Sequence, residues 1–353
     1  MIFFKVSLAI FLSFFFIKLI SNNASKLGLI DVPNERSSHI VHTPRGAGIG
    51  FGGGFFISSL VFWDFFLENW LIYLSLFLVF LIGILDDHKD AKPKTKFYVI
   101  FFATVLLFLD DVYISSLGQY FGFELSLWYL ALPFSMFALA GFTNALNLID
   151  GIDGLAGTIS LIILTTFFYL GYRFEDQFIQ IVSLLLIVSL IPFMYFNWNP
   201  AKIFMGDSGS LFLGFGISII AVCLLKYIHP IAIFYLTAIP ILDTIIVMTR
   251  RIKKGFSPFS PDKTHIHHIL LKFFYGNVIK SVLFLSLMQF LFSICGVMIA
   301  IHSTELGKSV GSIFALLSFI GITILFYIIF TGMHKRQKYI EKITKRAQRR
   351  KKN

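Results

Sequence analysis

The sequence predicts an all-α integral membrane protein, a bundle of about 11 transmembrane helices. Of its 353 residues, 57% are hydrophobic and only 14% are charged, whereas a soluble domain has about 25% charged and about 45–50% apolar residues. The mean hydropathy of +0.81 indicates the same class. The apolar runs are also too long and continuous for barrel strands, which alternate apolar and polar residues over about ten positions.

A helix needs about 20 mostly apolar residues to cross a bilayer. Runs of this kind predict spans, each defined to within a few residues, at 2–20, 48–67, 69–85, 97–113, 126–146, 155–171, 178–196, 209–226, 229–249, 278–300 and 311–332. The division between the second and third spans is the weakest, because only Glu68 and Asn69 separate them. The first run resembles a signal peptide, but its length and the lack of a small-x-small cleavage site predict a retained helix.

The basic residues predict that the N-terminus is outside and the C-terminus is cytoplasmic. Basic residues concentrate in cytoplasmic loops, and this orientation leaves outside only Lys5, Arg173, Lys226 and Lys308. Residues 1–332 are then one transmembrane domain and residues 333–353 a basic cytoplasmic tail. The tail is the main source of the net charge of +11, and it predicts an anchor beside anionic lipid rather than a nucleic-acid-binding arm. Cys223 and Cys295 both fall in spans, so neither a disulfide framework nor a cysteine metal site is expected.

Five polar segments stand out, and the predicted topology puts all of them on the cytoplasmic side. Polar clusters are costly near lipid and are therefore functional candidates. The first is a loop from Asp31 to Arg45, after which Gly50–Gly54 open the second helix. Glycines at a helix start can bring backbone N–H groups close to phosphate, or let membrane helices pack closely; the sequence leaves both open. Arg36 and Arg45 are predicted to contact phosphate.

The second segment is the acidic pair Asp86 and Asp87 at the end of the third span. Adjacent carboxylates repel each other unless a cation or proton lies between them, and a helix C-terminus disfavours negative charge. The pair therefore predicts a metal or proton-transfer role, with solvated acids beside lysines as the alternative.

The third segment joins the fifth and sixth spans and carries Asn147, Asp150 and Asp153. Their three-residue spacing lets one helical face or a tight turn aim all three at one point. A polar turn between helices is the alternative.

The fourth segment runs from Asn197 to Ser210 and leads into the eighth span. Asp207 lies between two glycines there and is predicted to bind Mg²⁺, which prefers carboxylate oxygens and substrate phosphates. Phe204 is either a stacking surface for a base or one more lipid-facing phenylalanine.

The fifth segment, in the basic loop 250–277, carries His265, His267 and His268. Imidazoles suit zinc, but with Arg and Lys they also make a diphosphate clamp, which the oxygen-rich neighbouring segments favour. Asp243, an acid inside the ninth span, either faces the site or pairs with a basic side chain.

Together these segments resemble the polyprenyl-phosphate N-acetylhexosamine-1-phosphate transferases over residues 27–275. The set of DDxxD, NxxNxxDGxDGLAG, FMGDSGS and HIHH carries the resemblance, in the same order and topology. The HIHH form is similar to the branch that begins O-antigen, common-antigen or wall-teichoic polymers. Ala47 departs from the family pattern, because related loops usually continue there with glycine.

The resemblance implies transfer of N-acetylhexosamine 1-phosphate from a UDP-sugar to polyprenyl phosphate, at the cytoplasmic face of a bacterial inner membrane. It implies Mg²⁺ on Asp207, with Mn²⁺ as an alternative cation. The residues that match catalytic positions of the family are Asp86, Asp87, Asp150, Asp153, His265, His267 and His268. Those predicted to bind substrate are Arg36, Arg45, Lys96, Asn147, Asn197 and Phe204. A homodimer is left open as an assembly.

The lipid phosphate needs no strong base, because the second pKa of a phosphate monoester is near 6. Direct attack is therefore favoured over a covalent aspartyl intermediate. A transporter is the rival class, but its ionisable residues would lie near the midplane, where only Asp243 is expected. A phosphotransferase that uses another nucleotide is the second rival.

Overall fold

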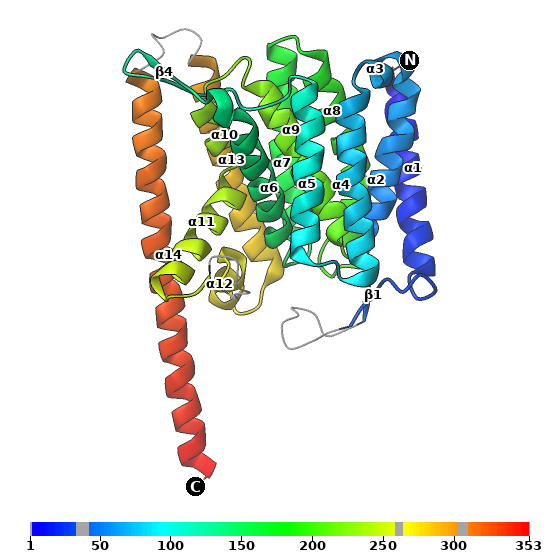
Figure 1. The fold of residues 1–353 in the computed structure, drawn as a ribbon. Coiled ribbons are helices and arrows are strands. Elements are labelled where there is room, and N and C mark those ends of the chain that lie inside the picture. Colours follow the sequence, from blue (N-terminus) through cyan, green and yellow to red (C-terminus); the bar gives the residue numbers. More distant parts are fainter. Residues whose placement is uncertain (1, 33–41, 258–263, 303–309, 353) are drawn as a thin grey trace.

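The computed structural model describes residues 2–32, 42–257, 264–302 and 310–352, and the chain in these ranges is almost entirely helical (Figure 1). The first six helices are α1 (Ile2–Asn23), α2 (Ala47–Ser59), α3 (Trp63–Glu68), α4 (Trp70–Lys89), α5 (Pro93–Leu109) and α6 (Ala131–Ile149). Those that follow are α7 (Leu155–Arg173), α8 (Gln177–Asn197), α9 (Asp207–Leu224), α10 (Pro230–Leu236), α11 (Ala238–Lys253), α12 (Ile266–Phe273), α13 (Val278–His302) and α14 (Val310–Lys352).

Two short 3₁₀ turns and four short strands complete the described chain. The turns are Leu60–Phe62 and Trp128–Leu130. The strands form two antiparallel pairs, β1 (Ile30–Asp31) with β2 (Thr43–Pro44) and β3 (Ser116–Tyr120) with β4 (Phe123–Ser126). None of the four was predicted. The β3–β4 hairpin lies at the end of the bundle opposite α12 (Figure 1).

The predicted class, a polytopic helical membrane protein, is confirmed. Among the described residues nine helices are long and apolar enough to cross a membrane, and the number is ten if α10 and α11, bent by 88°, are one span. The 17-residue α5 is shorter, but it packs between α4 and α6 (Figure 1). Each predicted apolar run overlaps one of these helices or the bent pair; the count of about 11 spans stays a prediction.

α9 is the central helix of the bundle. Every residue from Ser208 to Leu224 is buried, and α2, α4, α6, α7 and α8 pack around it. A helix that is apolar on all sides is stable only when neighbours cover every face. The start of α9 is therefore held at a fixed place among the helices that carry the polar segments.

All glycines of α2 except Gly53 lie in close contact with neighbouring helices, which supports packing, the second of the two alternatives open from the sequence. A methyl group on Gly50 would lie 2.7 Å from the backbone of Ile17 in α1, and one on Gly48 would lie 2.0 Å from the backbone nitrogen of Gly209 in α9. Small residues let membrane helices approach this closely. The glycines thus bring the loop before α2 against the start of α9.

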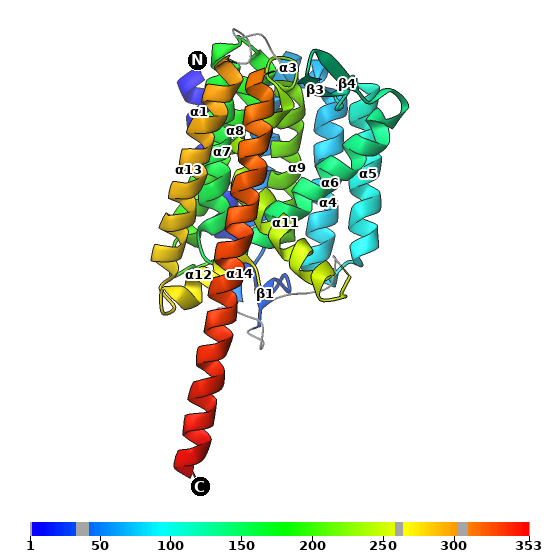
Figure 2. The same cartoon turned by 90° about the vertical axis from the view of Figure 1, so that its left-hand side faces the viewer.

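The polar segments lie at one end of the bundle, together with α12 and β1 (Figure 1). The same end carries the C-terminal part of α14, which continues unbroken past the bundle as a long helix (Figure 2). The chain's N-terminus and the β3–β4 hairpin lie at the other end (Figure 1).

Candidate active site

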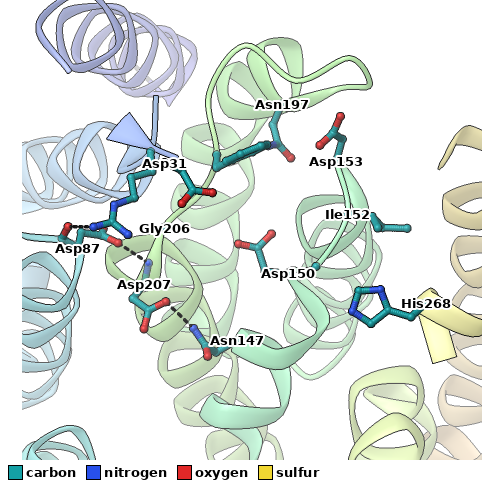
Figure 3. A pocket seen from close by; sticks show the side chains of 13 residues that line it. Asp31, Asp87, Asn147, Asp150, Ile152, Asp153, Asn197, Gly206, Asp207 and His268 are labelled. Carbon is teal, nitrogen blue, oxygen red and sulfur yellow. Dashed lines mark hydrogen bonds between the residues drawn. The ribbon is translucent and has the colours of Figure 1, made fainter. Parts of the chain in front are cut away.

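Described residues from all five polar segments line one cavity of about 330 Å³ at this end of the bundle. Figure 3 shows their side chains converging from α4, from the α6–α7 junction, from the start of α9 and from α12. The lining residues are Asp31, Arg45, Asp87, Asn147, Asp150, Gly151, Ile152, Asp153, Asn197, Phe204, Gly206, Asp207 and His268. Segments more than 200 residues apart in sequence thus form one polar site.

The two adjacent acids of α4 have different partners. Asp87 accepts hydrogen bonds from the backbone N–H groups of Asp207 (2.8 Å) and Ser208 (3.1 Å). These are first-turn donors of α9, which have no partner within their own helix, and a helix N-terminus favours negative charge. The α9 terminus thus compensates the unfavourable place of Asp87 at the end of α4.

Gly206 allows this approach. Its φ of +74° is in the left-handed region, and an added methyl group would lie 2.6 Å from the Asp87 carboxylate. Only glycine meets both requirements without strain. The glycine before Asp207 is therefore part of the Asp87 contact.

Asp86 pairs instead with Lys96 of α5. The Lys96 ammonium lies 2.6 Å from Asp86 Oδ2 and also contacts Asp207 Oδ2. The positive charge expected beside the acidic pair is therefore supplied in part by the ammonium group of Lys96. Neither Asp86 nor Lys96 lines the cavity; both are linked to it through Asp207, which does.

Asn147 fixes the other oxygen of Asp207. Its amide nitrogen donates to Asp207 Oδ1 (3.0 Å) (Figure 3). The same nitrogen donates to Ser210 Oγ (2.7 Å). The Asp207 carboxylate is therefore oriented by donors on both sides.

Asp150 and Asp153 share a spacing but differ in environment. Asp153 Oδ2 accepts from the side chain of Asn199 (2.8 Å) and from the backbone of Ala201 (3.0 Å), so it holds the loop before α9. Within the described part of the chain, Asp150 accepts no hydrogen bond and points into the cavity (Figure 3). Burial raises the pKa of Asp150 to about 7, with a further contribution from the negative charges of Asp207, Asp87 and Asp153.

This negative charge suits a hard divalent cation. Asp150 and Asp207 offer carboxylate oxygens to one cavity, which is the donor type that Mg²⁺ prefers. No cluster of three or more His, Cys, Asp or Glu side chains with metal-binding geometry occurs among the described residues. A cation here would thus take few protein ligands, the usual case for Mg²⁺ bound with substrate phosphates.

The predicted substrate-binding residues are placed as follows. Arg45 donates from Nη2 to the backbone oxygen of Asp87 (2.7 Å). The amide of Asn197 is used by backbone groups, since it accepts from Gly154 N–H (2.9 Å) and donates to the oxygen of Ile203 (2.9 Å). Arg36 lies outside the described residues.

Phe204 is half-buried and lines the cavity. Its backbone N–H donates to Pro44 O (2.8 Å) and its oxygen accepts from Ala47 N–H (3.0 Å), so the loops before α2 and α9 are joined. The ring is therefore held at the cavity wall by the backbone on both sides.

Only one of the three histidines reaches the cavity. His268 lines it, whereas His265 and His267 are 4% and 2% exposed and lie behind it. The centroid of the His267 ring lies 4.2 Å from the ring centroid of His268 and 5.6 Å from that of His265. Burial lowers the pKa of His267 to about 3, so this ring is neutral at physiological pH.

Asp243, left open by the sequence, pairs with a basic side chain. Its Oδ2 lies 2.7 Å from His265 Nδ1, and Oδ1 accepts from the backbone N–H of Ile266 (2.6 Å).

Comparison with known proteins identifies the family. Residues 69–225 match the model described as "Glycosyl transferase family 4". Over 318 residues, covering 86% of each chain, the sequence is 34% identical to the "Probable undecaprenyl-phosphate N-acetylglucosaminyl 1-phosphate transferase" of Bacillus subtilis (strain 168). The chain belongs to glycosyl transferase family 4.

Two further relatives of this family 4 chain carry the name "Undecaprenyl-phosphate alpha-N-acetylglucosaminyl 1-phosphate transferase". The protein of Escherichia coli (strain K12) is 33% identical over 262 residues, 70% of this chain and 71% of the relative. That of Haemophilus influenzae is also 33% identical over 262 residues, 70% of this chain and 73% of the relative. The family resemblance expected from the motifs is confirmed.

Some polar residues of this family 4 site were not predicted. Ser210 follows Asp207 by three residues on one helix, so its place on the same face could have been predicted. Asn199 was not singled out, because its contact with Asp153 joins two different loops. Nothing in the local pattern indicates that contact.

Proposed function

We propose that this chain transfers N-acetylglucosamine 1-phosphate from UDP-N-acetylglucosamine to undecaprenyl phosphate and releases UMP. The names of its relatives support the sugar and the lipid. The observation that carries the proposal is the convergence of five separate polar segments on one cavity. The product would be the diphosphate-linked lipid that begins an envelope glycan such as O-antigen, common antigen or a wall polymer.

In the proposed reaction an oxygen of the lipid phosphate attacks the β-phosphorus of the nucleotide sugar. A new P–O bond forms, the bond from the β-phosphorus to the bridging oxygen breaks, and its electron pair leaves with UMP. Because such transfers need chiefly alignment and charge stabilisation, we assign diphosphate binding to Arg45 and His268. Phe204 stacks on the uracil ring.

Asp86 and Lys96 would handle the acceptor. The ammonium of Lys96 offers a positive charge to the lipid phosphate, and Asp86 holds that ammonium in place. Since the acceptor is mostly dianionic at neutral pH, Asp86 needs to take only a residual proton.

Asp207, with Asp150, is the proposed holder of Mg²⁺, with Mn²⁺ as the alternative. When bound, the cation would neutralise diphosphate charge that builds up during transfer. Asn147 contributes by orienting the Asp207 carboxylate.

An apolar cavity of about 330 Å³ between α6, α9, α10 and α11 supports a lipid acceptor. It is lined along α6 from Phe134 to Ala145, which lies two residues before Asn147 of the polar site. A prenyl chain in this cavity would run along α6 toward the end of that helix that carries Asn147.

We further propose eleven spans, with α5 and the α10–α11 pair included, an outside N-terminus and a cytoplasmic active site. The distribution of basic residues supports this orientation, and the basic part of α14 lies at the same end as the cavity (Figure 2). Residues 1–332 would form the transferase domain and residues 333–353 its cytoplasmic tail.

The test is an assay of purified protein with undecaprenyl phosphate, a panel of UDP-N-acetylhexosamines and CDP-linked donors, with and without Mg²⁺. We expect UMP and a lipid-linked sugar diphosphate with UDP-N-acetylglucosamine, and neither product when the lipid is omitted. If only a CDP-linked donor gave product, or if no donor did, the proposal would be wrong.

A further inference from the structure

Asp243, a buried acid of α11, binds the segment that carries His265, His267 and His268. Asp243 is 1% exposed, and its two carboxylate oxygens bind two successive residues, the His265 ring (2.7 Å) and the backbone N–H of Ile266 (2.6 Å). Ile266 is the first residue of α12, whose first N–H groups have no partner within the helix. Asp243 therefore caps α12 from a different helix and orients the side chain that precedes it.

A second side chain of α11, that of Arg250, binds the residue just before His265. Arg250, about two turns after Asp243 on α11, is 3% exposed and donates from Nη1 to the backbone oxygen of Thr264 (2.7 Å). Its Nε donates to Thr331 Oγ1 of α14 (2.9 Å). An acid and a base of α11 thus bind the backbone on both sides of His265.

The held histidine is connected to the cavity through packed rings. His265 and His267 are nearly parallel, at 17°, and His267 lies against His268, which lines the cavity. On its other side His267 meets the Asp150 segment, because a methyl group on Gly151 would lie 2.2 Å from His267 Nε2. Densely packed side chains transmit displacements rather than absorb them, so a shift of His265 would move His268 relative to Asp150.

We propose that Asp243 and His265 are a positioning pair, which sets His268 at the place where the nucleotide diphosphate binds. The proposal rests on the proposed function and assigns His265 an action through its neighbours instead of contact with substrate. The essential interaction is the Nδ1–H bond to the carboxylate, which fixes the tautomer and orientation of the ring.

The test compares two kinds of change. Asp243→Asn weakens the bond to His265 and retains the volume of the side chain. We expect it to raise the KM for UDP-N-acetylglucosamine roughly tenfold, the lower end of the scale for residues that orient a binding side chain without contacting what it binds. The KM for undecaprenyl phosphate should not change. His265→Asn places an amide N–H near the position of Nδ1 and should stay within about threefold of the wild type, whereas His265→Ala should lose about as much as Asp243→Asn.

Asp176→Asn is the matched control. Asp176 also accepts from a backbone N–H at a helix start, that of Ile179 (2.9 Å), and from one side chain, Tyr227 (2.9 Å). It is the N-cap residue of α8, in the turn that follows α7, and does not line the cavity. We expect a fall in melting temperature comparable to that of Asp243→Asn, with both KM values unchanged. A purely structural role for Asp243 would give the two variants the same kinetics.

Two results would overturn the proposal: an unchanged KM in Asp243→Asn, or a loss in His265→Asn as large as in His265→Ala, which would show direct action of the ring. Histidine ¹⁵N NMR gives a readout that does not need turnover. A wild-type protein without UMP release would disprove the proposed function alone, whereas a His265 Nδ1 without its proton would disprove the positioning pair.

Discussion

The Asp87 carboxylate caps α9 at Asp207, accepting the backbone N–H of Asp207 at 2.8 Å across two helices of the bundle. Asp87 is therefore occupied with holding the backbone of the predicted cation-binding residue. Its neighbour Asp86 faces the Lys96 ammonium instead. This division separates the adjacent acids into a positioning role for Asp87 and a proposed chemical role for Asp86.

Removal of the Asp87 cap should destabilise the protein. Asp87→Ala leaves two N–H groups of α9 without their acceptor, and we expect a loss of about 1 kcal/mol or more, the usual cost of a lost N-cap, together with reduced transfer. Asp86→Asn should reduce transfer without this loss of stability. Thermal unfolding in detergent beside a UMP-release assay measures both effects, and equal melting temperatures for Asp87→Ala and the wild type would contradict the capping role.

Lys96 should compete with divalent cations for Asp207. Its ammonium contacts Asp207 Oδ2, so Lys96→Met removes both a competitor and a positive charge. We expect Mn²⁺ to bind roughly tenfold more tightly, the scale of one nearby charge, while transfer falls because the acceptor loses its proposed cation. Mn²⁺ titration followed by electron paramagnetic resonance, without substrate, tests this effect.

The control for that variant is Lys94→Met, on the same turn of α5 but exposed. Its Mn²⁺ affinity should equal that of the wild type. Weaker Mn²⁺ binding to Lys96→Met would show that the lysine supports the cation site instead of competing for it.

Stability should depend on pH through Asp150. Its pKa is raised from 3.8 to about 7 by burial and neighbouring acids, so the folded state binds a proton more tightly than the unfolded state. The stability from this proton is full below about pH 4 and is lost as the pH rises from about 4 to 7. Asp150→Asn should flatten this dependence and raise the melting temperature at pH 8, as measured in a buffer series; an unchanged slope would contradict the raised pKa.

Gly151 should tolerate no side chain. In Gly151→Ala the new methyl group would lie 2.2 Å from His267 Nε2, and we expect at least a tenfold loss of transfer from displacement of the histidine rings. Gly53→Ala, in α2 with no atom within 4 Å of the added carbon, is the control. Similar activity in the two variants would show that the contact between His267 and Gly151 has no role in the site.

Sequence reasoning was strongest where the signal is local. The apolar runs predicted the helices, and Asp207 was placed where the eighth predicted span, now α9, begins. It was weaker for the histidines, because the spacing does not tell which of three neighbouring rings reaches the cavity; the structure places only His268 there. For Asp243 the sequence offered two alternatives, and the contact with His265 decided between them.

The sequence by itself determined that this protein lies in a bilayer, where its helices occur along the chain, and that its five polar segments fall at helix ends. These properties follow from composition and periodicity, which local physical chemistry can interpret. Only the tertiary structure decided that Asp87 meets α9, that Lys96 bridges Asp86 and Asp207, and that α11 holds the histidine segment. Such contacts depend on how helices distant in sequence pack around α9, and that packing is a property of the whole chain.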